Sequence, residues 1–372
     1  MSVRIERVPY SALGAQVAHI KPRLMAAVEQ VIDGGRYILG PNVLAFEQAF
    51  ADYCGTTRSV GLANGTCALH LVLCGIGLEP GDEVITAPNS FLASASTIAL
   101  AGAKPVFVDV GTDMNMDPTK LEAAITSHTK AIIPVHLTGR PARMPAILDI
   151  ATRHGLFVLE DAAQAVGAAL DGRRVGGWGH AATFSLHPLK NLFAFGDAGM
   201  MTTSDEAVAA RTMLARNHGL KDRNTCEFWS FNCRLDELQA AMLRICLDEL
   251  DAWTAERRRL AFRYNDALRG HVAVPDEGPG EHHVYQTYMI QAEDRDRLQA
   301  FLTQHQVEAL VHYATPIHLQ PAAADLGYAA DDFPVCRDVV SRILSLPLYP
   351  GLTEAQQDRV IGLIAQFYGG RA

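Results

Sequence analysis

The sequence predicts an α/β fold in which helices cover both faces of a mostly parallel sheet. Short apolar runs rich in β-branched residues alternate with helix-length segments between about residues 55 and 205, as in parallel strands joined by crossover helices. The chain of 372 residues is also long enough for two or three domains with buried cores. The runs expected to form strands are 83–86, 105–109, 131–135, 156–161 and 182–186, with a further strand at 284–290.

Two short segments and one long segment are expected to be helical. Residues 22–32 and 68–74 have helix-like patterns, and residues 235–269 contain neither Gly nor Pro. The long segment is expected to form one helix or two stacked helices, and a helix of that length is a natural link to a second unit. We therefore assign residues 1–250 to a large cofactor-binding domain and residues 251–372 to a small α+β C-terminal domain. The N-terminal segment could pack on the small domain.

Composition and charge narrow the classes of function. The chain has 41 acidic and 32 basic residues, a formal charge of -9, which disfavours non-specific nucleic-acid binding because that binding needs a basic surface. No apolar run approaches the length of a membrane span, and the N-terminus has no secretion-type apolar region. The seven cysteines form no CxxC pair, so we expect reduced thiols, a cytoplasmic location and no metal site.

An acid and a lysine occupy positions suited to covalent cofactor chemistry. Asp161 closes the run 156–161 and should lie at the carboxyl end of a parallel strand, where open α/β sheets bind ligands. Lys190 follows the later run 182–186 and precedes a Gly-rich turn. Pyridoxal 5'-phosphate needs an acid that keeps its pyridine nitrogen protonated and an amine that attacks its carbonyl. Each residue also has a plainer interpretation, Asp161 as a helix cap and Lys190 as a solvated surface charge.

A phosphorylated cofactor also needs an anion cradle. Asn64, Gly65, Thr66 and Cys67 follow a short apolar run and open the helix-like segment 68–74. Unpaired N–H groups and the helix dipole favour a phosphate at such a helix start, aided by the Thr66 hydroxyl. Ordinary capping by Asn64 or Thr66 is the alternative.

Several ordered motifs resemble the DegT/DnrJ-type sugar aminotransferase family, from about Gly34 to Pro350. The resemblance implies a fold-type-I pyridoxal-phosphate enzyme, usually a homodimer with active sites at the subunit interface. The motifs are Asn64–His70, Gly81–Ile85, Glu160–Gln164, Ser185–Asn191, Gly196–Gly199, Asn232–Ala240 and Ser345–Pro350.

The resemblance implies a cofactor role for each matching residue. Lys190 matches the catalytic Schiff-base lysine, and Asp161 matches the acid paired with the pyridine nitrogen. Gln164 matches a residue close to the ring hydroxyl. Phe91 occupies the place where the family stacks an aromatic ring on the cofactor, with a buried core aromatic as the alternative. The implied phosphate ligands are Gly65, Thr66, the Cys67 backbone, Ser185 and the partner subunit's Asn232.

Substrate contacts are expected from His187, Arg234 and His318, with His312 as a further histidine that could contact substrate. Arg234 could bind a carboxylate or a diphosphate through its bidentate guanidinium. Each residue has an alternative: a histidine is often a core or surface residue, and Arg234 could simply pair with the nearby acids at 236 and 237.

The resemblance implies transfer of an amino group from L-glutamate or L-glutamine to a keto sugar. In this family the acceptor is typically a nucleotide-linked 3- or 4-keto-deoxysugar, used in amino-sugar biosynthesis. The alternatives are a keto-cyclitol aminotransferase, a non-catalytic sensor of the cofactor, and a sugar dehydratase, which would carry His in place of Lys190. A cysteine desulfurase would need a mobile cysteine such as Cys226.

Overall fold

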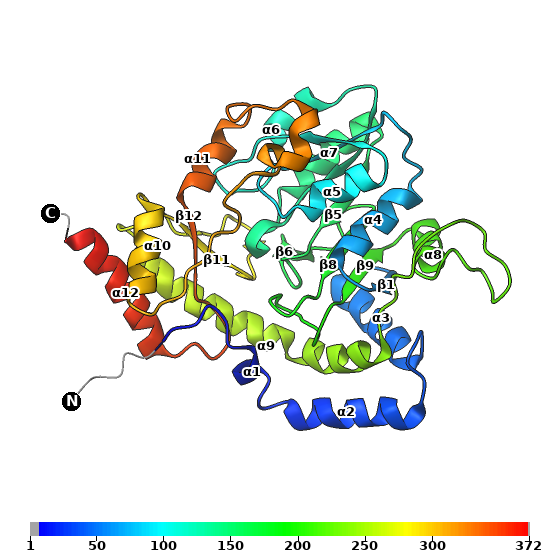
Figure 1. Ribbon diagram of the computed structural model, residues 1–372, viewed down its shortest axis with the longest axis horizontal. Coiled ribbons are helices and arrows are strands. Elements are labelled where there is room, and N and C mark those ends of the chain that lie inside the picture. The colour runs from blue at the N-terminus through cyan, green and yellow to red at the C-terminus, as the bar shows by residue number, and fades with distance from the viewer. Residues whose placement is uncertain (1–6, 371–372) are drawn as a thin grey trace.

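The computed structural model describes residues 7–370, and its centre is a seven-stranded sheet (Figure 1). The strand order is β1-β9-β8-β5-β4-β2-β3. Only β9 runs antiparallel to its neighbours in this sheet, so the predicted mostly parallel sheet is confirmed. The strands are β1 (Arg58–Leu62), β2 (Glu83–Thr86), β3 (Lys104–Phe107), β4 (Thr129–Ile133), β5 (Phe157–Asp161), β8 (Ala181–Ser185) and β9 (Gly199–Thr203).

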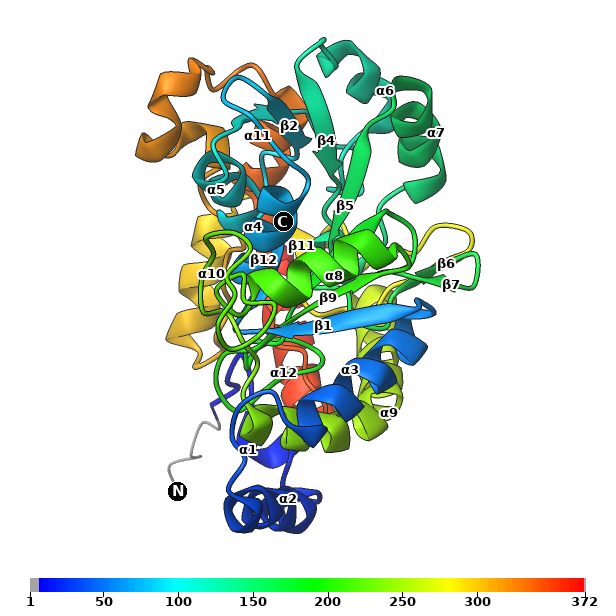
Figure 2. The same cartoon turned by 90° about the vertical axis from the view of Figure 1, so that its right-hand side faces the viewer.

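Helices cover both faces of this sheet because its side chains alternate between two apolar layers (Figure 2). Phe184 packs toward α2, α3 and α9, and Val158 toward α6 and α7 on the same side of the sheet. Leu159 and Ala181 point to the opposite side, toward α4, α5 and α8. These helices, with the short α1, are α1 (Leu13–Gln16), α2 (Lys21–Gly34), α3 (Pro41–Cys54), α4 (Gly65–Gly75), α5 (Ala93–Leu100), α6 (Pro118–Leu121), α7 (Met144–His154), α8 (Glu206–Ala215) and α9 (Glu237–Leu268).

The long helix α9 leads from this sheet to a second apolar cluster, on the left of Figure 1. There an antiparallel pair, β11 and β12, packs with α10, α12 and the end of α9. Val8 is buried in the same cluster and its backbone pairs with Val307. The elements are α10 (Arg295–Gln304), α12 (Glu354–Gly369), β11 (Tyr288–Gln291) and β12 (Ile343–Leu346).

Smaller elements connect these two parts. A three-stranded sheet contains β6 (Ala169–Leu170), β7 (Arg173–Arg174) and β10 (Glu281–His282). Helix α11 (Pro334–Arg342) packs into the cluster beside β2 and β4 rather than with α10 and α12. The remaining turns are the 3-10 helices η1 (Glu122–Ala124), η2 (Leu137–Gly139), η3 (Ile317–Leu319) and η4 (Pro321–Leu326).

The expected boundaries differ from the structure in two places. The strand expected at 284–290 begins only at Tyr288, because the N–H groups of Val284 and Thr287 donate to the turn at residues 138–139 and Tyr285 has a positive φ of 45°. The division between residues 250 and 251 falls inside α9, and α11 from the C-terminal region packs beside the large sheet. The two-domain division therefore stays a proposal.

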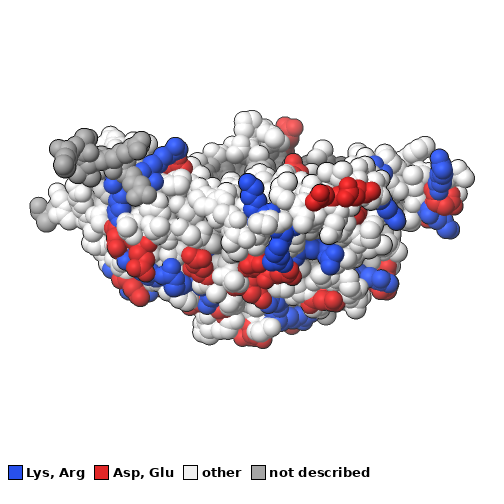
Figure 3. Space-filling view, turned by 90° about the horizontal axis from the view of Figure 1, so that it is seen from below, with Lys and Arg blue, Asp and Glu red and all other residues white. Residues whose placement is uncertain are grey.

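Within residues 7–370, no helix is both long and apolar enough to cross a membrane. The same described part of the chain contains no group of three or more His, Cys, Asp or Glu side chains that could hold a metal ion. Acidic and basic side chains are interspersed on the face of the molecule shown in Figure 3.

Candidate active site

A cavity of about 660 Å³ opens where β5 and β8 end and α4 begins. The carboxyl ends of parallel strands meet at one edge of the sheet, so residues distant in sequence converge there. Ten of the predicted residues line this cavity: Gly65, Thr66, Cys67, Phe91, Asp161, Gln164, Ser185, His187, Lys190 and His312.

Asp161 is a buried carboxylate held in a fixed orientation. Its side chain is only 4% exposed, and its Oδ2 accepts a 2.7 Å hydrogen bond from the Ser94 hydroxyl. Its Oδ1 accepts from the backbone N–H of Ala163 at 3.2 Å. The next regular element along the chain is β6 and not a helix, so Asp161 does not act as a helix cap.

Lys190 faces Asp161 across the cavity from a turn that follows β8. The turn is fixed by the Lys190 N–H, which donates to the His187 carbonyl at 2.8 Å. Removal of the ammonium from bulk water lowers the pKa of Lys190 to about 8, while the negative charge of Asp161 opposes this shift. At pH 7 about one tenth of Lys190 therefore carries a neutral, nucleophilic amine, far more than for an ordinary lysine with a pKa near 10.5.

The start of α4 forms a crowded backbone cradle. Asn64 is the N-cap, and its side chain accepts from the Cys67 N–H at 2.8 Å, so the capping interaction expected as an alternative is present. The N–H groups of Gly65 and Thr66 precede the first intrahelical hydrogen bonds and stay available for an anion. A Cβ atom on Gly65 would lie 2.9 Å from the Cβ of Ser185, so only glycine allows this approach.

Gln164 and Phe91 complete the cavity on the side of Asp161. The Gln164 side chain accepts from the Thr138 N–H at 2.5 Å and donates to the Tyr313 hydroxyl at 3.3 Å. The ring of Phe91 lies 5.6 Å from that of Tyr313, centroid to centroid, and is 51% exposed. The alternative interpretation of Phe91 as a buried core residue is wrong, because half of its surface is open.

Residues 18–365 match the model of the DegT/DnrJ/EryC1/StrS aminotransferase family. The chain belongs to this family. The expected resemblance is therefore confirmed over nearly the whole sequence, and the chain is a pyridoxal-phosphate-dependent aminotransferase.

Relatives of known name are similar along their full length. A "pleiotropic regulatory protein" of Geobacillus stearothermophilus is 45% identical over 366 residues, 97% of this chain and 98% of that protein. A dTDP-3-amino-3,4,6-trideoxy-alpha-D-glucose transaminase of Streptomyces venezuelae is 41% identical over 372 residues, 99% of this chain and 98% of that protein. The solved structure of S. venezuelae DesV with a ketimine intermediate has a TM-score of 0.95 and 40% identity, covering 97% of this chain and 98% of that chain.

The residues of this aminotransferase fit its cofactor. The buried carboxylate of Asp161 and the low-pKa amine of Lys190 share one cavity, and the glycine cradle at the start of α4 lies at its edge. A related structure, NtdA from Bacillus subtilis, is 30% identical with a TM-score of 0.92 over 99% of this chain and 86% of that chain. It was solved with bound PMP, the amine form of the cofactor.

Several cavity residues of this aminotransferase were not predicted as cofactor contacts. Tyr10 comes from the N-terminal segment, and its ring lies 5.7 Å from that of His312, centroid to centroid. His312 also lines the cavity, where its Nδ1 lies 2.9 Å from the Ser345 hydroxyl. Burial and the nearby Lys190 charge lower the pKa of His312 to about 4, so the imidazole is neutral at pH 7. His312 is expected from the sequence only as a histidine that could contact substrate, and no local pattern in the sequence marks Tyr10.

Three predicted residues lie outside this cavity. His318 is a correction: η3 directs its ring into an aromatic cluster, where it is 3% exposed and 4.7 Å from the ring of Phe333. Arg234 donates to the Asn217 side chain at 2.9 Å, while Glu237 accepts from Asn42 and Val43 instead of pairing with Arg234. Asn232 is exposed on the segment between α8 and α9, which projects on the right of Figure 1.

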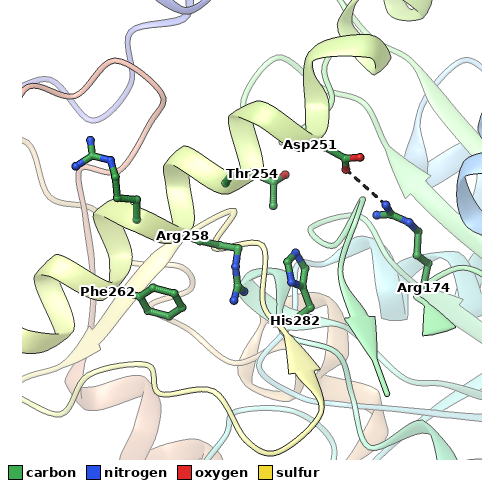
Figure 4. Close-up of a pocket in the computed structure, with 8 residues that line it drawn as sticks. Arg174, Asp251, Thr254, Arg258, Phe262 and His282 are labelled. Carbon is green, nitrogen blue, oxygen red and sulfur yellow. Dashed lines mark ion pairs between the residues drawn. The ribbon is translucent and has the colours of Figure 1, made fainter. Parts of the chain in front are cut away.

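A second cavity, of about 560 Å³, lies along α9 and is shown in Figure 4. Its charged groups already have partners: Arg174 pairs with Asp251 at 3.6 Å, and Arg258 forms an ion pair with Glu277. None of the residues predicted for the cofactor or the substrate lines this cavity. The residues predicted for the cofactor therefore converge on the larger cavity and not on this one.

Proposed function

We propose that this enzyme transfers the amino group of L-glutamate or L-glutamine to a nucleotide-linked 3- or 4-keto-deoxysugar. The observation that carries this proposal is the pairing, in one cavity, of a buried Asp161 with a Lys190 whose pKa is about 8. Relatives that span the whole chain are named as transaminases of dTDP- and UDP-linked sugars, which supports the acceptor class.

When bound, pyridoxal 5'-phosphate supplies an aldehyde that carries the amino group and a protonated ring that accepts electrons from the substrate carbon. Asp161 would hold the proton on the ring nitrogen, because its buried carboxylate is oriented by Ser94 and Ala163. Lys190 would hold the cofactor through its amine and, once freed, move a proton from the Cα of the amino donor. The neutral amine required for both tasks is accessible because burial lowers the pKa of Lys190.

The remaining cavity residues would bind and orient the cofactor. The N–H groups at the start of α4 and the hydroxyls of Thr66 and Ser185 would hold the phosphate, where the helix dipole favours negative charge. The exposed Phe91 ring would stack on the pyridine ring, and Gln164 would contact the ring hydroxyl. His187 and His312 also line the cavity and are the two predicted substrate contacts in it.

A homodimer with shared active sites follows from the same proposal. Asn232 lies outside its own subunit's cavity, on a projecting segment whose Trp229 and Phe231 are 96% and 56% exposed. Exposed aromatic side chains of this size are typical of interface anchors. The partner subunit's Asn232 would then reach the cofactor phosphate of this subunit. Arg234 lies on the same segment and would bind the substrate in the other subunit's cavity.

The cysteines and the surface charge support the expected cytoplasmic location and the expected small-molecule substrate. All seven cysteines are free thiols, which agrees with a reducing cytosol as the location. Interspersed charges on the face in Figure 3 and the formal charge of -9 agree with a small-molecule substrate rather than nucleic acid as the partner.

Borohydride reduction of the holoenzyme followed by peptide mapping tests the cofactor assignment. We expect the cofactor adduct on Lys190, and an adduct on another lysine would overturn the assignment. L-Glutamate should then convert the bound cofactor to its amine form, with loss of the absorption band of the lysine-bound form. Retention of that band with every amino donor would favour the cofactor sensor or the dehydratase.

A further inference from the structure

Two cysteines from distant parts of the chain meet at the edge of the phosphate cradle. Cys67 lies in the first turn of α4, and Cys233 lies on the segment before α9. Cys67 packs against the apolar cluster that contains Cys233, and the two thiols lie close enough for each to affect the pKa of the other. The backbone keeps them together, because the Ala63 N–H donates to the Cys233 carbonyl at 3.0 Å and Leu62 forms a bridge with Arg234.

The surroundings of Cys67 favour its thiolate. The neighbouring Cys233 side chain and, more weakly, Asn64 lower the pKa of Cys67 to about 7, against partial burial and the negative charge of Asp197. A position in the first turn of a helix favours a thiolate as well. Cys67 also lines the active-site cavity, so a small oxidant can reach its sulfur.

The other cysteines lack this combination. Cys54, Cys246 and Cys336 are buried, and burial is the main cause that raises the pKa of each thiol. Cys74 is exposed, but partial burial of its thiol raises its pKa. Cys226 is exposed as well, but its thiol donates to the carbonyls of His218 and Phe228 and not to another cysteine. Reactivity toward an oxidant should therefore concentrate on Cys67.

We propose that Cys67 and Cys233 form an oxidation site in which a peroxide converts two thiols into one disulfide. The Cys67 thiolate attacks hydrogen peroxide, which breaks the O–O bond, forms Cys67 sulfenic acid and releases hydroxide. The Cys233 sulfur then attacks the Cys67 sulfur and displaces the oxygen as water. In total, two thiols and one hydrogen peroxide give one disulfide and two water molecules.

The disulfide would alter the phosphate cradle. An S–S bond of about 2.05 Å is much shorter than a non-bonded contact between two thiols, so its formation pulls the first turn of α4 toward the 233 segment. A phosphate at this helix start also disfavours the Cys67 thiolate through charge repulsion. Cofactor binding and oxidation should therefore oppose each other, and by linkage the opposition is reciprocal. The opposition between cofactor binding and oxidation rests on the proposed position of the cofactor phosphate. The formation of the disulfide does not depend on that position.

Peptide mapping of peroxide-treated protein under non-reducing conditions tests the proposal. In the apoenzyme we expect a cross-linked peptide that contains Cys67 and Cys233 and lacks two hydrogen atoms, and saturating pyridoxal 5'-phosphate should slow its formation. In Cys233→Ser, dimedone should label Cys67 as the sulfenic acid. Cys226→Ser serves as the matched control and should form the cross-link at the same rate. If Cys233→Ser does not fold, the presence or absence of the cross-linked peptide in the unmodified chain decides whether the proposal holds.

A Cys67 that stays a free thiol, or one that oxidises without joining Cys233, would overturn the proposal. Oxidised apoenzyme should bind pyridoxal 5'-phosphate about tenfold more weakly, with recovery after dithiothreitol. A disulfide that leaves cofactor affinity unchanged would overturn the link to the cradle. Borohydride labelling of Lys190 in the reduced protein is independent of all these outcomes, so failure of the oxidation site would leave the aminotransferase assignment intact.

Discussion

The Ser94 hydroxyl donates a 2.7 Å hydrogen bond to Asp161, and both side chains are buried. Ser94 is in turn 2.8 Å from the hydroxyl of Ser90, so a short polar chain leads from α5 to the acid at the end of β5. The Ser94 contact fixes the direction of the carboxylate and stabilises its charge. The acid assigned to the cofactor ring is thus positioned by a helix that follows a different strand.

Replacing Ser94 by alanine should therefore impair catalysis. A hydrogen bond to a charged group contributes about 1.5–3 kcal/mol, so kcat/KM of Ser94→Ala should fall at least about tenfold. Ser96→Ala on the exposed face of the same helix is the matched control and should retain activity. Equal kcat/KM values for the two variants would show that Ser94 does not position Asp161.

The lowered pKa of Lys190 sets the pH dependence of cofactor attachment. Only the neutral amine attacks an aldehyde, so the attachment rate of the apoenzyme should rise with pH and level off above about 8. Stopped-flow measurement of the absorption change at a series of pH values gives the apparent pKa. A rate that keeps rising toward pH 10 would mean that the amine titrates like an ordinary lysine and that burial does not shift its pKa.

The same shift affects the stability of the apoenzyme in a defined direction. Between about pH 8 and the ordinary lysine value of 10.5, the unfolded chain binds more protons at this position than the folded chain. The free energy of unfolding should therefore rise with pH in that window. Urea titrations of the apoenzyme and of Lys190→Met should show a steeper rise in the unmodified chain. Parallel curves would contradict the prediction.

Glycine at position 65 is expected to be required for cofactor affinity. Gly65→Ala would place a Cβ atom 2.9 Å from the Ser185 Cβ and so push apart the two segments of the cradle. We expect the dissociation constant for pyridoxal 5'-phosphate to rise at least about tenfold, a loss of about 1.4 kcal/mol. Gly75→Ala at the other end of α4 is the control, because its Cβ would meet only the flexible Arg211 side chain at 3.4 Å. Its affinity should stay unchanged, and an equal loss in both variants would point to helix destabilisation.

Mixing two inactive variants tests the shared active site. Asn232→Ala and Lys190→Ala chains should each be inactive or nearly so, whereas a hybrid dimer would contain one site with both native residues. We expect activity to return when the purified variants are mixed and allowed to exchange subunits. Each variant incubated alone is the control. If the mixture stays inactive while mass measurements show exchanged dimers, Asn232 acts within its own subunit.

The residues at the centre of the cavity could be predicted because their signals are local in the sequence. Asp161 and Lys190 each follow an apolar run that is long enough for one strand, and the start of α4 carries a glycine and capping residues in consecutive positions. Strand periodicity and turn chemistry depend on neighbours along the chain. The parallel topology then brings these strand ends to one edge of the sheet.

The remaining contacts depend on packing between distant segments. His318 has the same local appearance as a ligand histidine, yet η3 directs it into an aromatic cluster. Tyr10 reaches the cavity because the N-terminal segment pairs with residues near 307, an arrangement that no local pattern encodes. The meeting of Cys67 with Cys233 has the same origin, since their contact depends on how the 233 segment lies against β1.

The sequence by itself determined the parallel α/β sheet, the family and most of the residues that line the active-site cavity, because hydrophobic periodicity and short motifs express local physics. Only the tertiary structure decided the pKa of Lys190 and the hydrogen bond from Ser94 to Asp161. It also decided that His318 lies outside the cavity and that the thiols of Cys67 and Cys233 are neighbours. Each of these depends on burial and on distances between segments far apart in the chain, and such distances are fixed only when the layers of the fold pack together.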